Sequence, residues 1–503
     1  MKRYLLLLLI IFSYINVFAQ SNTIHQNDFE EIKGKVLDAD TQLPLAFTNI
    51  GILSKNRGTV SNEEGKYLLN IIGLQLSDTV SFNYMGYKAV KISISDLVHA
   101  PVVQLSENVI SISDFVVYGN DIDAKAIVKK VLENKERNYK PSLQKSRMFI
   151  RNRYATDMLK LKVKPLKNTF DQLDENTARL IERSVPKKQL SYTDYYGDVY
   201  STNNKDIDKG ERIKLSPIKI ISLKDNVDYS EIENTFGNLF KDTKDDEYWK
   251  VASGIFSTKA NFENDSSKID STYSIEEYKN TMNSWFFTEQ INRSNRFLSM
   301  NSDESWEFLY DTGKYNYTMF GGTRIKGEDV YIIDFEAKRR GDFKGRLYIS
   351  CSTFAILKAD YQFAEGKLGT DVNMFGISYK ETIQKITLFY ENHDGIYKLK
   401  YFFRQEGELV GVSRKVELIK KRERFLLDKT IARYKVHLEI KARNLNSIEI
   451  LVIDDIVISE QEFAGFKSKK RLKVKHVNIF DDKMWQGYSI IAPTEQMKDY
   501  RKR

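Results

Sequence analysis

The stretch RGTVSNEEGKYLLNI, residues 57–71, decides the fold of the N-terminal part of this chain. Its first residues lead into a polar turn, Gly65 can take a positive φ to close that turn, and Tyr67 begins a returning strand. The stretch therefore predicts a β-hairpin. Glu63 and Glu64 lie at its tip, where we expect both carboxylates to face solvent; a calcium site at the same tip is the alternative.

Short strands separated by turn residues continue on both sides of this hairpin. Val80, Phe82 and Tyr84 are apolar or aromatic and alternate with other residues, which is typical of a strand with one buried face. Several such strands in succession predict a seven-strand-type β-sandwich over residues 32–110.

Residues 33–107 also carry a series of motifs that resembles the carboxypeptidase-regulatory-like domain, a transthyretin-type β-sandwich common in envelope proteins of Gram-negative bacteria. Residues 34–38 fit its G-x-V-x-D, residues 41–45 its T-x-x-P-L, residues 58–67 its G-T-x-S-[DN]-x-x-G-x-[YF], and residues 78–87 its closing segment. The resemblance implies a folding or interaction module without catalytic activity, in which the motif residues have structural roles. The motif positions are Gly34, Asp38, Pro44, Gly58, Thr59, Ser61, Asn62, Gly65, Tyr67, Gly86 and Tyr87.

The chain begins with two basic residues, an apolar run and small residues at positions −3 and −1 of a cleavage site. We expect residues 1–19 to be a signal peptide that is cut between Ala19 and Gln20, followed by a flexible segment at 20–31. The protein is then exported to the periplasm or associates with the outer membrane, with the cell surface as an alternative. Cys351 is the only cysteine, so the exported chain forms no internal disulfide.

The remaining chain predicts a mainly β protein with an α+β middle region. Residues 121–140 have apolar positions at helical spacing and predict an amphipathic helix that links the two parts. Residues 142–300 are predicted to be α+β or loop-rich. Residues 301–460 contain alternating strands with turn residues between them, which predict a long antiparallel β-meander that forms a curved sheet or half-barrel. Residues 461–503 form a basic C-terminal segment.

The net charge of +9 is spread over most of the chain, with one concentrated run, FKSKKRLKVKH, at 466–476. Behind a signal peptide, this run favours contact with a membrane surface over nucleic acid. An exposed, charged edge strand is the alternative. The cations concerned are Lys467, Lys469, Lys470, Arg471, Lys473 and Lys475.

Motifs for catalysis are absent from the sequence. Its five histidines form no HExxH, and it contains no GxSxG, phosphate loop or CxxC; the SxxK match at 142–145 is expected by chance. We therefore assign no catalytic, metal or cofactor residue and expect no cofactor. The sequence favours an exported, non-enzymatic envelope protein that binds or scaffolds an envelope protein, lipid or glycan. The alternatives are a secreted glycan- or peptide-acting hydrolase and an outer-membrane β-barrel component.

Overall fold

The computed structural model describes residues 30–500, except for positions 54, 56, 141, 172, 226, 242, 255 and 326 and the segments 110–122, 203–211 and 261–278. The predicted signal peptide, its cleavage site at Ala19 and Gln20, and most of the predicted flexible segment lie outside the described residues. Within them, no helix is both long enough and apolar enough to cross a membrane.

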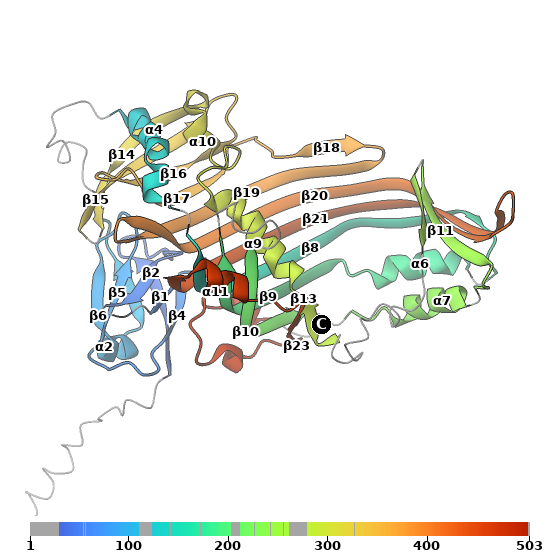
Figure 1. Cartoon of the computed structure of the whole chain (residues 1–503), viewed down its shortest axis with the longest axis horizontal. Coiled ribbons are helices and arrows are strands. Elements are labelled where there is room, and N and C mark those ends of the chain that lie inside the picture. The colour runs from blue at the N-terminus through green and yellow to red at the C-terminus, as the bar shows by residue number, and fades with distance from the viewer. Residues whose placement is uncertain are drawn as a thin grey trace, which may run out of the picture.

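The N-terminal residues form the predicted seven-strand sandwich (Figure 1, blue). One sheet has the order β4-β1-β7 and the other the order β3-β2-β5-β6. Its core is closed by the side chains of Val36, Ile50, Val80 and Phe82, none of them exposed. The elements are β1 (Glu31–Asp38), β2 (Asn49–Ile52), β3 (Gly58–Val60), β4 (Lys66–Asn70), β5 (Thr79–Asn83), β6 (Val90–Ser93), α2 (Ile94–His99) and β7 (Val102–Leu105).

The predicted linking helix is present as α4 (Ala124–Glu133), followed by the short α5 (Lys135–Asn138). Asp123 caps α4, because its carboxylate accepts the backbone N–H of Lys125 at 2.9 Å. The apolar stripe of α4 is buried against α10 (Glu307–Tyr310) and the strand β14 (Tyr315–Ile325).

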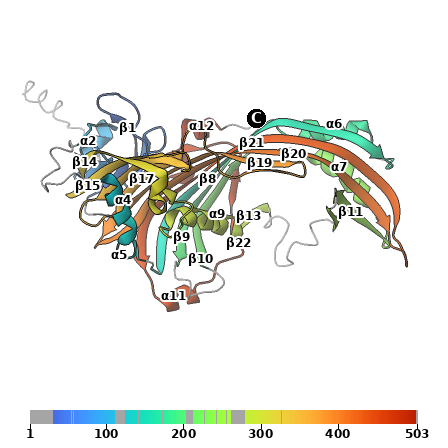
Figure 2. The same cartoon turned by 90° about the horizontal axis from the view of Figure 1, so that it is seen from above.

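A 14-stranded sheet is the main element of the rest of the molecule, and it is curved and open (Figures 1 and 2). Its order is β14-β15-β16-β17-β19-β20-β21-β8-β9-β10-β23, so that β14 and β23 lie at its two edges. Nearly all neighbours are antiparallel, which confirms the predicted meander; the β10–β23 pair is parallel. The C-terminal strands are β15 (Glu328–Ala337), β16 (Phe343–Ser350), β17 (Ile356–Phe363), β18 (Asp371–Met374), β19 (Ile377–His393), β20 (Ile396–Arg422), β21 (Lys429–Val457) and β23 (Lys475–Val477).

Strands from the middle region extend the same sheet. β8 (Gln144–Asn168) pairs with β21 from end to end, and β9 (Lys188–Ser201) and β10 (Ile213–Lys224) follow it. β11 (Glu247–Ser253) and β12 (Phe256–Ala260) form a hairpin that pairs with β20. The helices of this region are α6 (Glu175–Ser184), α7 (Ser230–Lys241) and α9 (Trp285–Leu298).

Both faces of the sheet are buried where β20 and β21 lie beside the N-terminal domain, because successive side chains of a strand point to opposite faces. Phe402 and Ile450 face the core that contains Phe287 of α9, whereas their neighbours Phe403 and Leu451 face the N-terminal domain. The domain and the C-terminal segment therefore cover one face, and the helices cover the other. The remaining short elements are β13 (Thr281–Asn283), the turn η2 (Thr312–Lys314), α11 (Glu460–Gly465), β22 (Arg471–Lys473), the turn η3 (Asp482–Trp485) and α12 (Glu495–Lys498).

Candidate functional site

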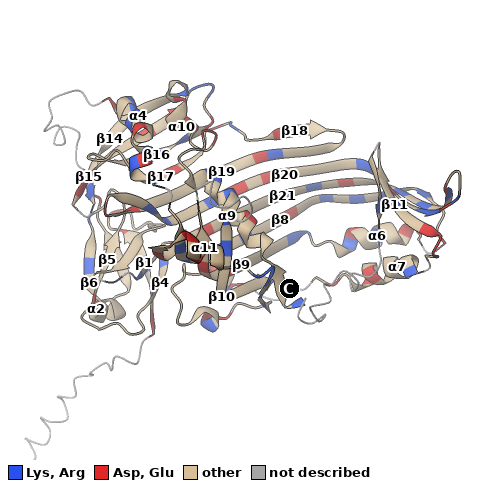
Figure 3. Ribbon diagram, viewed as in Figure 1, with Lys and Arg blue, Asp and Glu red and all other residues tan. Residues whose placement is uncertain are grey.

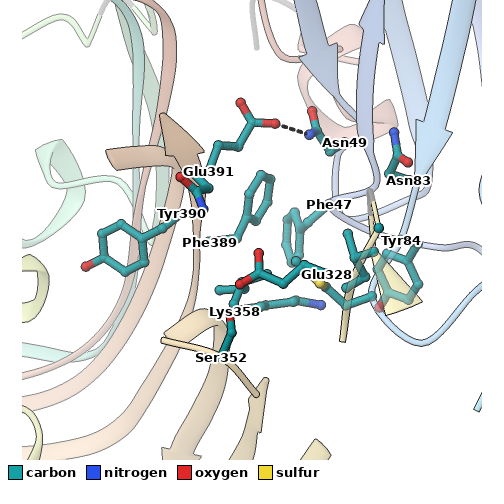
Figure 4. Close-up of a pocket in the computed structure, with 15 residues that line it drawn as sticks. Phe47, Asn49, Asn83, Tyr84, Glu328, Ser352, Lys358, Phe389, Tyr390 and Glu391 are labelled. Carbon is teal, nitrogen blue, oxygen red and sulfur yellow. Dashed lines mark hydrogen bonds between the residues drawn. The ribbon is translucent and has the colours of Figure 1, made fainter. Parts of the chain in front are cut away.

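A cavity of about 550 Å³ lies between the N-terminal domain and the large sheet (Figure 4). The domain contributes residues on and beside β2 and β5, and the sheet contributes residues of β15, β17 and β19 and of the turns beside them. Neither part has this cavity alone. The lining residues that Figure 4 labels are Phe47, Asn49, Asn83, Tyr84, Glu328, Ser352, Lys358, Phe389, Tyr390 and Glu391.

One wall of the cavity is aromatic. Phe47 has φ 64°, a left-handed conformation that bulky residues rarely adopt. In this conformation its ring stacks on the rings of Tyr401 and Phe403, each with a centroid distance of 5.2 Å. Phe389 stacks on the same Tyr401 at 5.4 Å. The strained position of Phe47 thus inserts a ring of the domain into the aromatic surface of the sheet.

Polar side chains lie beside these rings, and one hydrogen bond there joins the domain to the sheet. The Asn49 amide donates to the Glu391 carboxylate at 2.7 Å, as the dashed line in Figure 4 marks. Phe389 and Glu391 are two residues apart on β19, so strand alternation directs both of them to the face that meets the domain. On the other side of the rings of Phe47 and Phe389 in Figure 4, the Glu328 carboxylate accepts hydrogen bonds from the Tyr397 hydroxyl at 2.7 Å and from the Ser350 hydroxyl.

Lys358 brings a buried positive charge to the cavity, since the residue is 3% exposed. Its ammonium lies 2.9 Å from the Asp360 carboxylate and 4.5 Å from the centre of the Tyr84 ring. Burial lowers the pKa of Lys358, but the Asp360 carboxylate and the nearby tyrosines outweigh it and raise the pKa above its ordinary value. The cavity therefore offers a permanent cation beside an aromatic ring.

The combined lining suits a ligand with both hydroxyl groups and an apolar face. Amides, carboxylates and an ammonium can exchange hydrogen bonds with several hydroxyls, while the aromatic planes can pack on the apolar face of a ring. Among the described residues, no group of three or more His, Cys, Asp or Glu side chains is placed to hold a metal ion.

A larger cavity of about 780 Å³ lies beside α9 and is lined mostly by charged residues. Its lining contains four Lys or Arg and seven carboxylates, together with five aromatic side chains. Some of these charges pair within the lining; for example, Arg404 lies 3.2 Å from Glu406. Burial raises the pKa of Glu381 at this site. Because the cavity beside the domain is bounded by two separate parts of the chain, the sandwich and the large sheet, we regard it as the better candidate site.

The motif residues mostly hold the domain together. The Asp38 carboxylate accepts the Thr41 backbone N–H at 2.7 Å and the Tyr87 hydroxyl at 2.6 Å, and these bonds lower its pKa to about 2. A Cβ at Gly34 would lie 2.1 Å from the Pro101 carbonyl oxygen, whereas Gly65 closes its turn at φ 73°. The remaining motif residues contact their neighbours within or beside the domain: Pro44 bridges to Leu37, Ser61 bonds to Leu45, Tyr67 bonds to Pro101, Gly58 lies against Ile50, and Gly86 has φ 86°.

Two motif side chains bind the C-terminal segment of the chain. The Thr59 hydroxyl donates to the Ile490 carbonyl at 2.8 Å, and the Asn62 amide donates to the Ala492 and Pro493 carbonyls at 3.2 and 3.3 Å. α12 begins two residues after Pro493, at Glu495.

The expectation that both carboxylates of the hairpin tip face solvent is wrong for Glu64. Its two oxygens accept the backbone N–H of Glu495 at 3.0 and 3.1 Å, and they contact the Lys66 ammonium at 3.0 Å. Glu63 is exposed. The tip is therefore an internal contact with the start of α12.

Most cations of the basic run at 466–476 are exposed, and part of the run lies in short strands. This agrees with the alternative prediction of an exposed, charged edge strand. Lys467, Lys469, Lys470, Lys473 and Lys475 are exposed, and the last two lie in the short strands β22 and β23. Arg471 is engaged with the protein, because its guanidinium donates to the hydroxyl of Thr281 at 2.7 Å.

Sequence reasoning missed every polar residue of the cavity. Asn49 fits the Asn of an A-x-x-N-I motif over residues 46–50 of the resembling family, but Glu391 lies in an ordinary strand 342 residues away, so nothing local connects them. The signals that were present are Asn83, the last residue of β5, and Tyr84, which continues the alternation of this strand by one residue.

Comparisons with known proteins address the domain and the overall shape separately. A search of curated protein sequences found no match. Among solved structures, similarity extends to a LolA superfamily protein from Nitrosomonas europaea, with 9% identity, 67% of this chain and 95% of that chain covered, and a TM-score of 0.17. A domain described as an outer membrane lipoprotein-sorting protein from Vibrio parahaemolyticus has 9% identity, covers 68% and 98%, and has a TM-score of 0.20.

The MucA/MucB complex of Pseudomonas aeruginosa also matches, with 6% identity, 65% and 93% covered, and a TM-score of 0.18. TM-scores of this size support no conclusion about function. A family model does identify the N-terminal part, and it agrees with the motifs and the seven strands. Residues 32–117 are a CarboxypepD_reg-like domain.

Proposed function

We propose that this protein is an exported, non-enzymatic binding protein of the bacterial cell envelope, and that it holds a polyhydroxylated ligand, such as the end of an envelope glycan, in the cavity between its domain and its sheet. The observation that carries the proposal is the composition of the cavity, in which aromatic rings lie beside amides, carboxylates and a buried ammonium. The expected signal peptide supports an envelope location.

The experiment is a calorimetric titration of the protein with two probes, oligosaccharides released from lipopolysaccharide and soluble peptidoglycan fragments. We expect one of them to bind with one site per chain. Tyr84→Ser removes a ring from the cavity wall and should weaken binding about tenfold. Tyr229→Ser is the matched control, because Tyr229 is 37% exposed and lies outside the cavity. Binding that is equal in both variants, or absent with both probes, contradicts the proposal.

A hydrolase is the second candidate, because two carboxylates, Glu328 and Glu391, line one aromatic cavity. Glycosidases use such a pair for acid–base chemistry. In this chain, both carboxylates already accept hydrogen bonds from protein groups, which suits binding. The same titration samples should be assayed for new reducing ends. Turnover that Glu328→Gln or Glu391→Gln abolishes would establish the hydrolase and exclude a non-enzymatic role.

A further inference from the structure

The turn between β20 and β21 carries three successive apolar side chains that nothing covers. Phe425, Leu426 and Leu427 are 101%, 86% and 85% exposed, whereas no other large apolar side chain in the described part of the chain exceeds 70%. Single exposed apolar residues are common on protein surfaces, but a fully exposed run of three is not. Such a run is typical of a surface that contacts another molecule or a membrane.

Polar contacts hold this turn without using the apolar side chains. The Glu423 carboxylate lies 3.0 Å from the Lys259 ammonium, and the Asp428 carboxylate accepts the Tyr248 hydroxyl at 2.6 Å. Asp428 also accepts the backbone N–H of Arg424 at 3.3 Å, which closes the turn. The contacts at its base present the three apolar side chains outward.

The hairpin behind the turn is supported on one side. Its strands pack on the hydrophobic cluster that contains Phe170, Trp249 and Tyr434, and β11 pairs with the end of β20. Figure 1 shows the turn at the end of the molecule farthest from the N-terminal domain, and Figure 2 shows the sheet curving toward it. The apolar run thus lies at the extremity of the molecule.

Positive charge surrounds the run. Residues 420–429, KKRERFLLDK, contain five Lys or Arg and two carboxylates, and both carboxylates are engaged in the contacts described above. Lys420 and Arg422 are paired with Glu247 and Asp246 of the adjacent segment. Lys421, Arg424 and Lys429 flank the apolar side chains on both strands. Figure 3 shows that charges of both signs alternate along the rest of the hairpin, so this excess is local.

We propose that Phe425, Leu426 and Leu427 insert into the interface of an anionic lipid bilayer while the flanking cations contact its headgroups. A convex, fully exposed tip offers no pocket or groove for a protein partner, whereas a fluid hydrocarbon phase needs no shape complementarity. The basic flanks complement anionic headgroups, and each cation near such a surface strengthens binding about fivefold. This attachment is independent of the ligand cavity, which lies at the other end of the sheet.

The test is flotation of the purified chain with vesicles of phosphatidylethanolamine and phosphatidylglycerol, and separately with phosphatidylcholine vesicles. The wild type should float with the anionic vesicles and bind the neutral ones more weakly. Phe425→Ser/Leu426→Ser/Leu427→Ser should reduce the partition coefficient about tenfold or more. The matched control is Leu43→Ser/Ile218→Ser/Ile479→Ser, which removes three exposed apolar side chains that are scattered over the surface. It should float like the wild type.

Two further variants distinguish insertion of this tip from attachment through the basic run at 466–476. Phe425→Trp should show fluorescence quenching by lipids that carry bromine on their acyl chains, which reports insertion directly. Lys469→Gln/Lys470→Gln/Lys473→Gln, in the basic run, should float like the wild type. Equal flotation of the tip variant and the wild type, loss of flotation only in the basic-run variant, no flotation of the wild type, or tip-dependent self-association without lipid would each overturn the proposal.

Discussion

At the scale of single residues, a buried carboxylate with a raised pKa lies where the domain meets the sheet. The Glu449 carboxylate accepts the Tyr401 hydroxyl at 3.0 Å and lies close to the buried ion pair of Arg151 and Asp194, whose closest atoms are 2.8 Å apart. Burial raises the pKa of Glu449 to about 7; Arg151 opposes this shift, and Glu63 of the hairpin tip adds to it.

This pKa predicts how stability changes with pH. The folded-state pKa of Glu449, about 7, lies above its ordinary value of 4.5, so the folded state holds the proton more tightly. The stabilising contribution is complete below the ordinary value and is lost as the pH rises through about 7. Glu449→Gln keeps an acceptor but does not titrate. Relative to wild type, it should therefore gain about 1–3 kcal/mol of unfolding free energy between about pH 4 and about pH 8.

Urea unfolding at both pH values measures this gain. Glu63→Gln, which removes a nearby negative charge, should give a smaller gain of the same sign. A difference between Glu449→Gln and wild type that does not change with pH would show that Glu449 titrates normally.

At the scale of elements, the C-terminal segment 490–498 acts as a strap across the domain and the sheet. The domain holds it through Thr59 and Asn62, and the sheet holds it through Arg151, whose guanidinium donates to the Ile491 carbonyl at 3.1 Å. The Asn62 side chain also stabilises the hairpin turn, because its carbonyl oxygen accepts the backbone N–H groups of Glu64 and Lys66, each at 2.9 Å. One side chain therefore shapes the hairpin turn and binds the strap.

Asn62→Asp separates these two tasks. The carboxylate keeps both acceptor bonds of the turn but replaces a donor that faces two carbonyl oxygens, which should cost about 1–3 kcal/mol. By hydrogen exchange, we expect faster exchange at α12 and unchanged exchange at the amides of Glu64 and Lys66. Asn373→Asp, in the exposed strand β18, is the control and should change neither. Equal protection of α12 in Asn62→Asp and wild type would show that the strap does not depend on this contact.

The sequence predicts the sandwich, but it does not predict which distant strands pair in the large sheet. The sandwich follows from turn residues such as Gly65 and from a series of motifs, because all its strands lie within one continuous stretch, from β1 to β7, even where the pairing strands are not consecutive. The pairing of β8 with β21 joins residues that are far apart, and both strands carry charges along much of their length, so no local pattern indicates it. The cavity could not be predicted for the same reason, since Asn49 and Glu391 are distant in the sequence and meet only in the folded protein.

At the scale of the whole molecule, the domain is part of the core and not an appendage. Three of its side chains, Phe47, Val60 and Leu68, lie in one buried cluster with Tyr401 of the sheet and Trp485 of the C-terminal segment. A cluster that spans three parts of the chain should make their unfolding cooperative. The same cluster joins the domain to the sheet beside the cavity that they share.

Phe47→Ala tests this coupling. Phe47 is 9% exposed, and its loss should cost about 3–5 kcal/mol while leaving the domain's own core intact. Wild type should unfold in one calorimetric transition, and Phe47→Ala in two, because the domain then melts apart from the sheet. Phe82→Ala removes a ring of equal size from the domain core but leaves the Phe47 stacking in place, so it should lower stability and keep one transition. One transition in Phe47→Ala, or two in wild type, would mean that the aromatic contact does not couple the two parts, and that the cavity walls can move independently.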